Sequence, residues 1–270
     1  MAISLYAQNN QTEESTLDAS TSAQEATSDW SFSGSAVFSS RPYEGGFSKT
    51  QTAGEVNRGM VATDDSMGLG DSNEGMYALG AKYKRWSAVF NYMPTNFEGT
   101  GTALIGSKDP GMNGALVESP LDTNINVKMY LANVSYDIIQ TPNMIFGLGV
   151  GFGATSVEMS ILPEDRPELA IDYGGTQPFG FLSMHMKNKY EDFLYGFTIR
   201  AIQANFQNVD VGYSDYKIDL GYRLIDDWYN LDAVGGYRNV TFDAALVVEG
   251  GDVASKMNLK GPFIGLAMSY

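Results

Sequence analysis

Apolar and polar residues alternate with a period of two along most of the chain after residue 29. The alternation is clearest in the segments 216–224 and 229–240, where one face is mostly apolar and the other carries most of the charges. Successive side chains of a β-strand point to opposite faces of its sheet, so this period indicates strands. The pattern predicts strands at 30–40, 75–83, 86–93, 123–139, 144–157, 176–187, 193–205, 216–224, 229–240 and 257–270.

The segments between the predicted strands alternate in length. Short turns are expected at 84–85, 140–143, 188–192 and 226–227. Long connectors are expected at 41–74, 94–122, 158–175, 206–215 and 248–255. In an up-and-down order, all the long connectors lie at one end of the sheet, and the short turns and both termini lie at the other. This asymmetry is typical of transmembrane barrels.

We therefore expect an all-β fold, an up-and-down antiparallel transmembrane β-barrel of about ten strands. A sheet whose apolar face meets lipid has to close, because backbone groups at an open edge find no partner in hydrocarbon. The predicted strands reach about the 9 to 11 residues that a tilted strand needs to cross a bilayer. The segment 240–248 leaves the strand count open, because it also fits two strands that extend far above the bilayer.

Aromatic residues lie near the strand ends on the side of the short turns. Trp and Tyr are enriched where a membrane meets water, because their rings are apolar and their tips polar. We expect an interfacial girdle there, made of Trp30, Trp86, Tyr136, Trp228 and Tyr270.

The last predicted strand closes the chain with the alternating segment PFIGLAMSY, residues 262–270. With the strand alternation and the connector asymmetry, this ending resembles the single-chain outer-membrane β-barrels of bacteria, over residues 30–270. The resemblance implies a bacterial outer-membrane location, contact with outer-membrane lipid and lipopolysaccharide, and recognition of the last strand by the barrel-assembly machinery. The alternative is a soluble antiparallel barrel or sandwich, in which the apolar alternates would face inward.

Composition excludes several classes of function. The 270 residues contain no cysteine and a single histidine, which excludes disulfide frameworks and thiolate metal sites. The formal charge of −15 would repel nucleic acid. We expect no cofactor. The longest charge-free run, 138–157, has glycines two apart and contains Pro142, so no transmembrane helix is expected.

The chain divides into a tail, residues 1–29, and the barrel, residues 30–270. Residues 8–29 carry five acidic and no basic residues and show no apolar periodicity, which predicts a disordered acidic tail. Residues 1–7 resemble the end of a signal-peptide cleavage site, and an added start methionine explains them about as well.

Charged residues of the late strands are expected to face the lumen. If Asp226 and Asp227 form a two-residue turn, Arg223 faces Asn230. Asp232 then lies diagonal to Arg223, within reach of its guanidinium. The predicted lumen network comprises Arg200, Lys217, Asp219, Arg223, Asp232 and Arg238. It either fills the lumen with ion pairs and water or lines a narrow conduit that selects small solutes by charge.

Two further patterns carry candidate chemistry. Residues 149–154 fit the dinucleotide-binding pattern G-x-G-x-x-A, but no helix follows. Glycines at 147, 149, 151 and 153 instead share one inward face and make room for a bulky neighbour across the lumen. His185 shares a strand face with Ser183. In a hydrolase, Ser183 would be the nucleophile and His185 the base, but the sequence shows no carboxylate that would orient His185. Its place near a short turn favours a polar lumen or interface residue, so no catalytic residue is assigned.

Acidic residues concentrate in the long connectors, which are expected to lie outside the cell. Carboxylates are ligands that Ca²⁺ and Mg²⁺ favour, but no spacing defines a dedicated metal site. The candidates for recruiting divalent cations are Asp64, Asp65, Asp71, Glu74, Glu164, Asp165 and Glu168.

The first functional hypothesis is a non-enzymatic outer-membrane barrel with a narrow polar lumen. Its long acidic extracellular loops would contact ions, lipopolysaccharide or a surface partner. The alternatives are a narrow, porin-like diffusion channel for small solutes and an outer-membrane lipid-modifying hydrolase that uses His185.

Overall fold

A single β-sheet makes up the protein in a computed structural model, which describes residues 29–53, 56–63, 67–107, 116–164, 170–206, 209–248 and 251–270. The strands in these residues are β1 (Trp30–Arg41), β2 (Tyr43–Ala53), β3 (Val56–Thr63), β4 (Ser72–Tyr83), β5 (Trp86–Ser107), β6 (Leu116–Gln140), β7 (Met144–Pro163), β8 (Ile171–Tyr190), β9 (Phe193–Phe206), β10 (Val209–Asp226), β11 (Asn230–Val248) and β12 (Gly251–Ser269). The predicted tail lies outside the described residues, except for Asp29.

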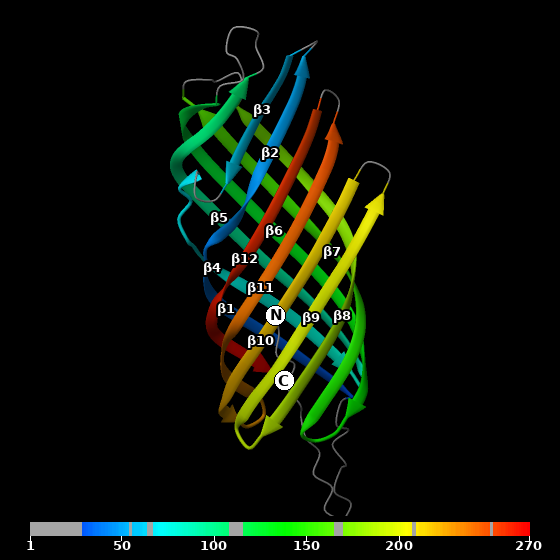
Figure 1. Cartoon of the computed structure of the whole chain (residues 1–270). Helices are drawn as coiled ribbons and strands as arrows, with labels where there is room; N and C mark the ends of the chain where they lie inside the picture. The colour runs from blue at the N-terminus through cyan, green and yellow to red at the C-terminus, as the bar shows by residue number, and fades with distance from the viewer. Residues whose placement is uncertain are drawn as a thin grey trace, which may run out of the picture.

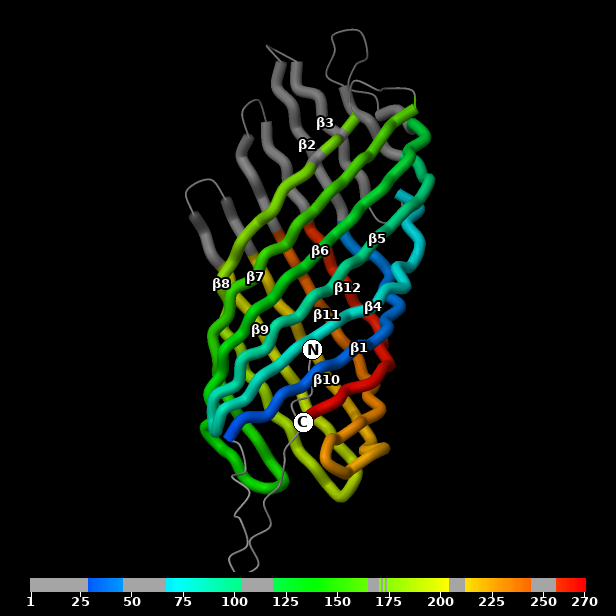
Figure 2. The backbone as a smooth tube through the Cα atoms, turned by 180° about the vertical axis from the view of Figure 1, so that it is seen from behind, coloured from blue at the N-terminus to red at the C-terminus, as the bar shows by residue number. Residues whose placement is uncertain are grey.

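The sheet closes into a barrel because the last strand pairs with the first. β12 runs antiparallel to β1 from Ser269, opposite Ser33, to Phe263, opposite Ser39. β1 and β2 share one position in the wall, interrupted at Pro42, and β3 and β4 share the next. The twelve described strands therefore fill ten positions, as the sequence predicts. The ring of strands can be followed from both sides (Figure 1 and Figure 2).

In the lower half of the barrel, apolar side chains face outward and polar ones face the interior. On β10, Ile218 and Leu220 are each 63% exposed, whereas the adjacent Lys217 and Asp219 are buried. This sidedness suits contact with lipid and is opposite to that of a soluble sandwich. It confirms the predicted transmembrane barrel. Among the described residues, no helix has the length and apolar character needed to span a membrane.

The sidedness reverses in the upper half of the same strands. On β6, Tyr130 faces outward, and the outward positions above it carry Lys128 and Asn126. The inward residues at this level, Met129 and Ile125, have no exposed surface. The upper half is therefore apolar inside and polar outside, like a water-soluble barrel.

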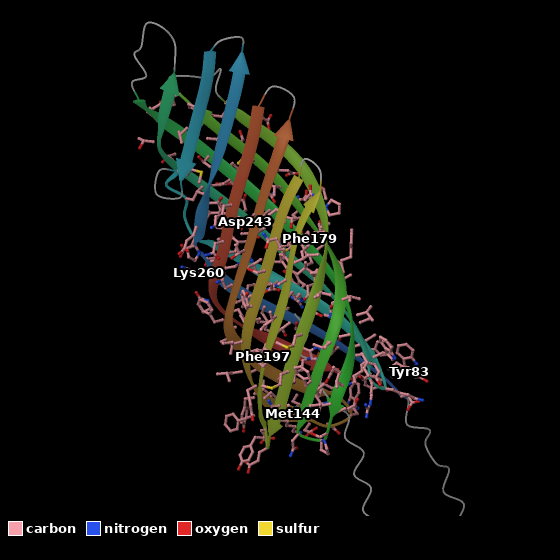
Figure 3. All side chains as sticks on the ribbon, turned by 45° about the vertical axis from the view of Figure 1, so that its right-hand side comes forward. Tyr83, Met144, Phe179, Phe197, Asp243 and Lys260 are labelled. Atoms are coloured by element: carbon pink, nitrogen blue, oxygen red, sulfur yellow. The ribbon has the colours of Figure 1, made fainter. Side chains whose placement is uncertain are left out.

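Outward charges mark this upper half. Asp243 and Lys260 lie well above Tyr83 and Met144, which are at the lower end (Figure 3). Lys260 Nζ lies 2.6 Å from Glu44 Oε1. Charges at this height are compatible with water and not with acyl chains, so the membrane has to end below them.

The long connectors predicted from the sequence are wrong in extent, because most of their residues continue the strands. The predicted connector 41–74 contains β2 and β3, and in 94–122 β5 runs to Ser107 and β6 begins at Leu116. The reversal of sidedness is the physical reason, since it interrupts the alternation that marks a lipid-facing strand. The alternative that the segment 240–248 belongs to extended strands is confirmed, because β11 continues to Val248 and β12 begins at Gly251.

Exposed aromatic residues form rows at two heights. The predicted girdle residues are exposed, with Trp86 packing edge-on against Tyr136 at 5.0 Å and Trp228 against Tyr270 at 5.9 Å between ring centroids. A second row, which the sequence did not reveal, lies where the sidedness reverses. It stacks ring on ring across neighbouring strands and comprises Tyr77, Tyr92 and Tyr130.

The wall has a seam between β4 and β5 above this second row. The two strands pair only up to Tyr77 and Tyr92, and higher on β5 the partner is β3. The short segment 67–70 lies beside the seam, where Leu69 forms an isolated bridge with Gly99 of β5. Met67 of this segment is fully buried in the apolar core. Gly68 beside it has φ of +61°, where an added Cβ would lie 2.1 Å from the Thr100 carbonyl oxygen.

Candidate functional site in the barrel interior

The interior at mid-height is organised around one carboxylate, Asp215 on β10. Arg200 Nη1 on β9, directly opposite in the sheet, donates to Asp215 Oδ2 at 2.6 Å. Arg238 on β11 adds a two-pronged contact, with Nε and Nη2 each 2.8 Å from one carboxylate oxygen. The Tyr213 hydroxyl donates to Asp215 Oδ2 at 3.2 Å. Planar guanidinium groups match a carboxylate in this way, so Asp215 fixes three strands relative to one another.

Asp215 itself was missed from the sequence, although its two arginine partners were predicted lumen residues. It lies at the end of the predicted connector 206–215, which conceals its place in a strand. One signal was available: Asp215 precedes Lys217 and Asp219 by steps of two and therefore shares their inward face.

Further down, the predicted network forms two separate ion pairs. Lys217 Nζ lies 3.0 Å from Asp219 Oδ1 on the same strand face. Arg223 Nε donates to Asp232 Oδ1 at 2.7 Å, and its Nη1 donates to Asn230 Oδ1 at 2.6 Å. All five side chains are buried.

The register around Arg223 corrects the predicted turn. Asp232 lies directly opposite Arg223 instead of diagonal to it, and the pairing shifts between Arg223 and Ile225. Asn230 pairs with Asp226, so the turn is longer than the two residues expected. The irregularity adds one residue to β10, which moves the whole pairing by one step.

A third cluster near the lower end supplies the carboxylate that His185 lacked in the sequence. Lys82 Nζ donates a hydrogen bond of 2.5 Å to Asp137 Oδ2 on β6. The other carboxylate oxygen, Asp137 Oδ1, lies 3.1 Å from His185 Nε2. Asp137 is 1% exposed. Ser183 Oγ lies 2.8 Å from Asn133 Oδ1. In this arrangement the serine hydroxyl is directed to an amide rather than to the imidazole.

The alternate glycines of β7 make these inward side chains possible. Gly147 lies opposite His185 on β8, and Gly151 lies opposite Phe181. A Cβ at Gly147 would lie 2.5 Å from His185 Cε1, and one at Gly151 would lie 2.2 Å from Phe181 Cζ. The glycines therefore make room as predicted, but for side chains of the adjacent strand rather than for a neighbour across the lumen.

Above the ion pairs the described interior is mostly apolar, with a few buried hydroxyl groups such as those of Thr95 and Thr123. The expectation of a polar lumen therefore holds mainly for the lower half. The aromatic part of the apolar interior includes Phe179 and Tyr213, whose ring centroids are 4.7 Å apart. The buried apolar cluster also includes Met67, Met93, Phe97, Leu121, Ile125, Val127, Met129, Ile161, Val240, Phe242 and Leu259.

Basic groups outnumber acidic ones among the described buried residues. Six basic and four acidic side chains are buried, an excess of two positive charges inside a chain whose formal charge is −15. The basic side chains are Arg41, Lys82, Arg200, Lys217, Arg223 and Arg238, and the acidic ones are Asp137, Asp215, Asp219 and Asp232. The interior therefore favours anions electrostatically.

The candidate divalent-cation residues are only partly described. Asp64, Asp65, Asp165 and Glu168 lie outside the described residues. Within the part of the chain that the structure describes, no group of three or more His, Cys, Asp or Glu side chains is placed to hold a metal ion.

Comparison with known proteins identifies the fold. No family model matches the sequence, and no curated protein matches it at a significant level. The outer membrane protease OmpT from Escherichia coli aligns with a TM-score of 0.54 at 11% identity, covering 89% of this chain and 97% of that one. The toluene transporter TbuX of Ralstonia pickettii aligns with a TM-score of 0.37 at 9% identity, covering 90% and 89%. The chain has the fold of the bacterial outer-membrane β-barrels.

Proposed function

We propose that the chain is an integral protein of the bacterial outer membrane that acts as a sealed scaffold, neither an enzyme nor an open pore. The closed interior carries the proposal. Asp215 and Asp232 in the ion-pair region, and Ile125 and Met129 in the apolar region above, all have 0% exposed surface. A conduit needs a continuous path of exposed polar groups along its axis.

The outer surface supports the location. The apolar outward band of the lower half has exposed aromatic rows at both edges, which is the arrangement of a barrel in a bilayer. The last strand, β12, has exposed apolar side chains such as Ile264 and Leu266 on its outward face, and we propose that the barrel-assembly machinery recognises this strand. The upper wall projects beyond the lipid and presents exposed polar groups such as Glu98 and Asp122 to lipopolysaccharide, cations or a surface partner.

Conductance across a planar lipid bilayer tests the scaffold. We expect the purified full chain to insert without forming channels, and heat-dependent gel migration of the recovered protein shows that it was folded. A reproducible single-channel conductance that changes in an Arg223→Ala variant would overturn the proposal in favour of the narrow diffusion channel, because Arg223 lies in the lumen.

One observation favours a second candidate, the lipid-modifying hydrolase. Asp137 lies 3.1 Å from His185 Nε2, which is the contact that orients a catalytic imidazole. The 2.8 Å contact of Ser183 with Asn133 speaks against it, because the nucleophile is not activated. An assay for acyl chains released from outer-membrane lipid decides between the scaffold and the hydrolase. We expect no release. Release by the wild type that disappears in a His185→Ala variant would establish the hydrolase.

A further inference from the structure

Arg41 is a buried arginine that belongs to none of the three ion-pair clusters. It lies at the upper end of β1, inside the barrel, and is 2% exposed. Its Nη2 donates to the Pro94 carbonyl oxygen of β5 at 3.0 Å, across the seam between β4 and β5. Its Nε and Nη1 are buried and have no hydrogen-bond partner among the residues that the structure describes. Two donor groups of a charged guanidinium are thus buried, and no described side chain accepts a hydrogen bond from them.

A second unpaired group lies opposite. Ser72 on β4 is the direct neighbour of Arg41 across the strand pair, and its hydroxyl is also buried without a partner in the described part of the chain. The arginine side chain offers only hydrogen-bond donors, and the serine hydroxyl adds one more donor besides its lone pairs. Donors of this kind surround bound anions.

The central carboxylate of the interior is already occupied. Asp215 already accepts hydrogen bonds from Arg200, Arg238 and Tyr213. Burial and then the charge of Arg238 lower the pKa of Arg41 to about 10, and the charge of Glu74 acts in the opposite direction. Arg41 stays protonated at neutral pH, so its charge has to be compensated inside the barrel.

We propose that a small inorganic anion of the halide class binds in the barrel interior between the Arg41 guanidinium and the Ser72 hydroxyl. A buried charged group without a partner is strongly unfavourable, and a bound anion removes that cost. Because Arg41 is only 2% exposed, we expect a monatomic ion rather than phosphate or a carboxylate. The excess of buried basic over acidic side chains supplies the field that retains it. This site is separate from the scaffold function.

Bromide is the probe, because it scatters anomalously and replaces chloride. In crystals of the full chain grown with sodium bromide, we expect an anomalous peak within hydrogen-bond distance of the Arg41 guanidinium. In solution, we expect the thermal unfolding midpoint of the detergent-solubilised protein to rise saturably with sodium bromide but not with sodium gluconate, whose anion is too large. An Arg41→Gln variant should lose this rise.

A Glu74→Gln variant separates the anion from the competing explanation, a direct Arg41–Glu74 ion pair. If the anion compensates Arg41, Glu74→Gln keeps the bromide response. No anomalous peak at Arg41, together with loss of stability in Glu74→Gln equal to that in Arg41→Gln, would overturn the proposal. If Arg41→Gln does not fold, the wild-type anomalous map and the Glu74→Gln titration decide between the two.

Discussion

Tyr130 and Met129 are consecutive residues on β6 that face opposite environments. Tyr130 points outward and stacks on Tyr92, with 5.1 Å between ring centroids. Met129 points inward and has no exposed surface. Below this pair the outward positions are apolar, and above it they are polar, so the pair marks the upper edge of the apolar band. The same strand thus works as a membrane strand and as a soluble strand in succession.

Arginine substitutions on the outward face of β6 test this boundary. Val134→Arg places a charge in the lipid-facing band, and we expect it to destabilise the barrel by about 2–4 kcal/mol. Asn126→Arg lies on the same face above Tyr130 and should change stability by no more than about 0.5 kcal/mol. Urea titration of the protein folded in lipid vesicles measures both. Equal losses would show that the boundary is misplaced.

Single-cysteine labelling tests which end faces outward from the cell, and the cysteine-free chain makes it unambiguous. Asn124 is exposed on the upper wall, and Asn143 is exposed in a short turn at the lower end. With a membrane-impermeant maleimide on intact cells, we expect labelling of Asn124→Cys and none of Asn143→Cys. The turn variant should react only after the cells are lysed. The reverse pattern would invert the proposed orientation.

Removal of the central carboxylate should be costly. Asp215→Asn leaves Arg200 and Arg238 buried with no carboxylate between them, so we expect a loss of about 3–5 kcal/mol in the free energy of unfolding. Asp122→Asn, at an exposed outward position, is the matched control and should be near neutral. Urea midpoints of both variants give the difference. A small effect at Asp215 would mean that water reaches the two arginines.

The glycine row on β7 should not tolerate side chains. A Cβ at Gly151 would lie 2.6 Å from the Ala132 carbonyl oxygen as well as against Phe181. We expect Gly151→Ala to destabilise the barrel by about 1–3 kcal/mol through overpacking. Gly174→Ala is the control, since no atom lies within 4 Å of its added Cβ. Thermal unfolding in detergent compares them, and an unperturbed Gly151→Ala would indicate that Phe181 moves freely.

The sequence alone determined the strand class, the ten positions in the barrel and the lipid-facing band, because a period of two is a local property of one strand. It also placed Arg200, Arg223 and Arg238 on the inward face. The sequence did not predict the full length of the upper strands, since their polarity is reversed. The residues that mark this height, Tyr77, Tyr92 and Tyr130, come together only when the strands pair.

Apart from the Arg223–Asp232 pair, which inward groups meet was decided only by the tertiary structure. Asp137 and His185 come together from β6 and β8 over the glycines of β7, and Asp215 lies between arginines of two different strands. Such contacts depend on the register of every strand pair and on the extra residue near Arg223. Closure of the ring fixes that register, and it is a condition on the whole sheet that no single segment contains.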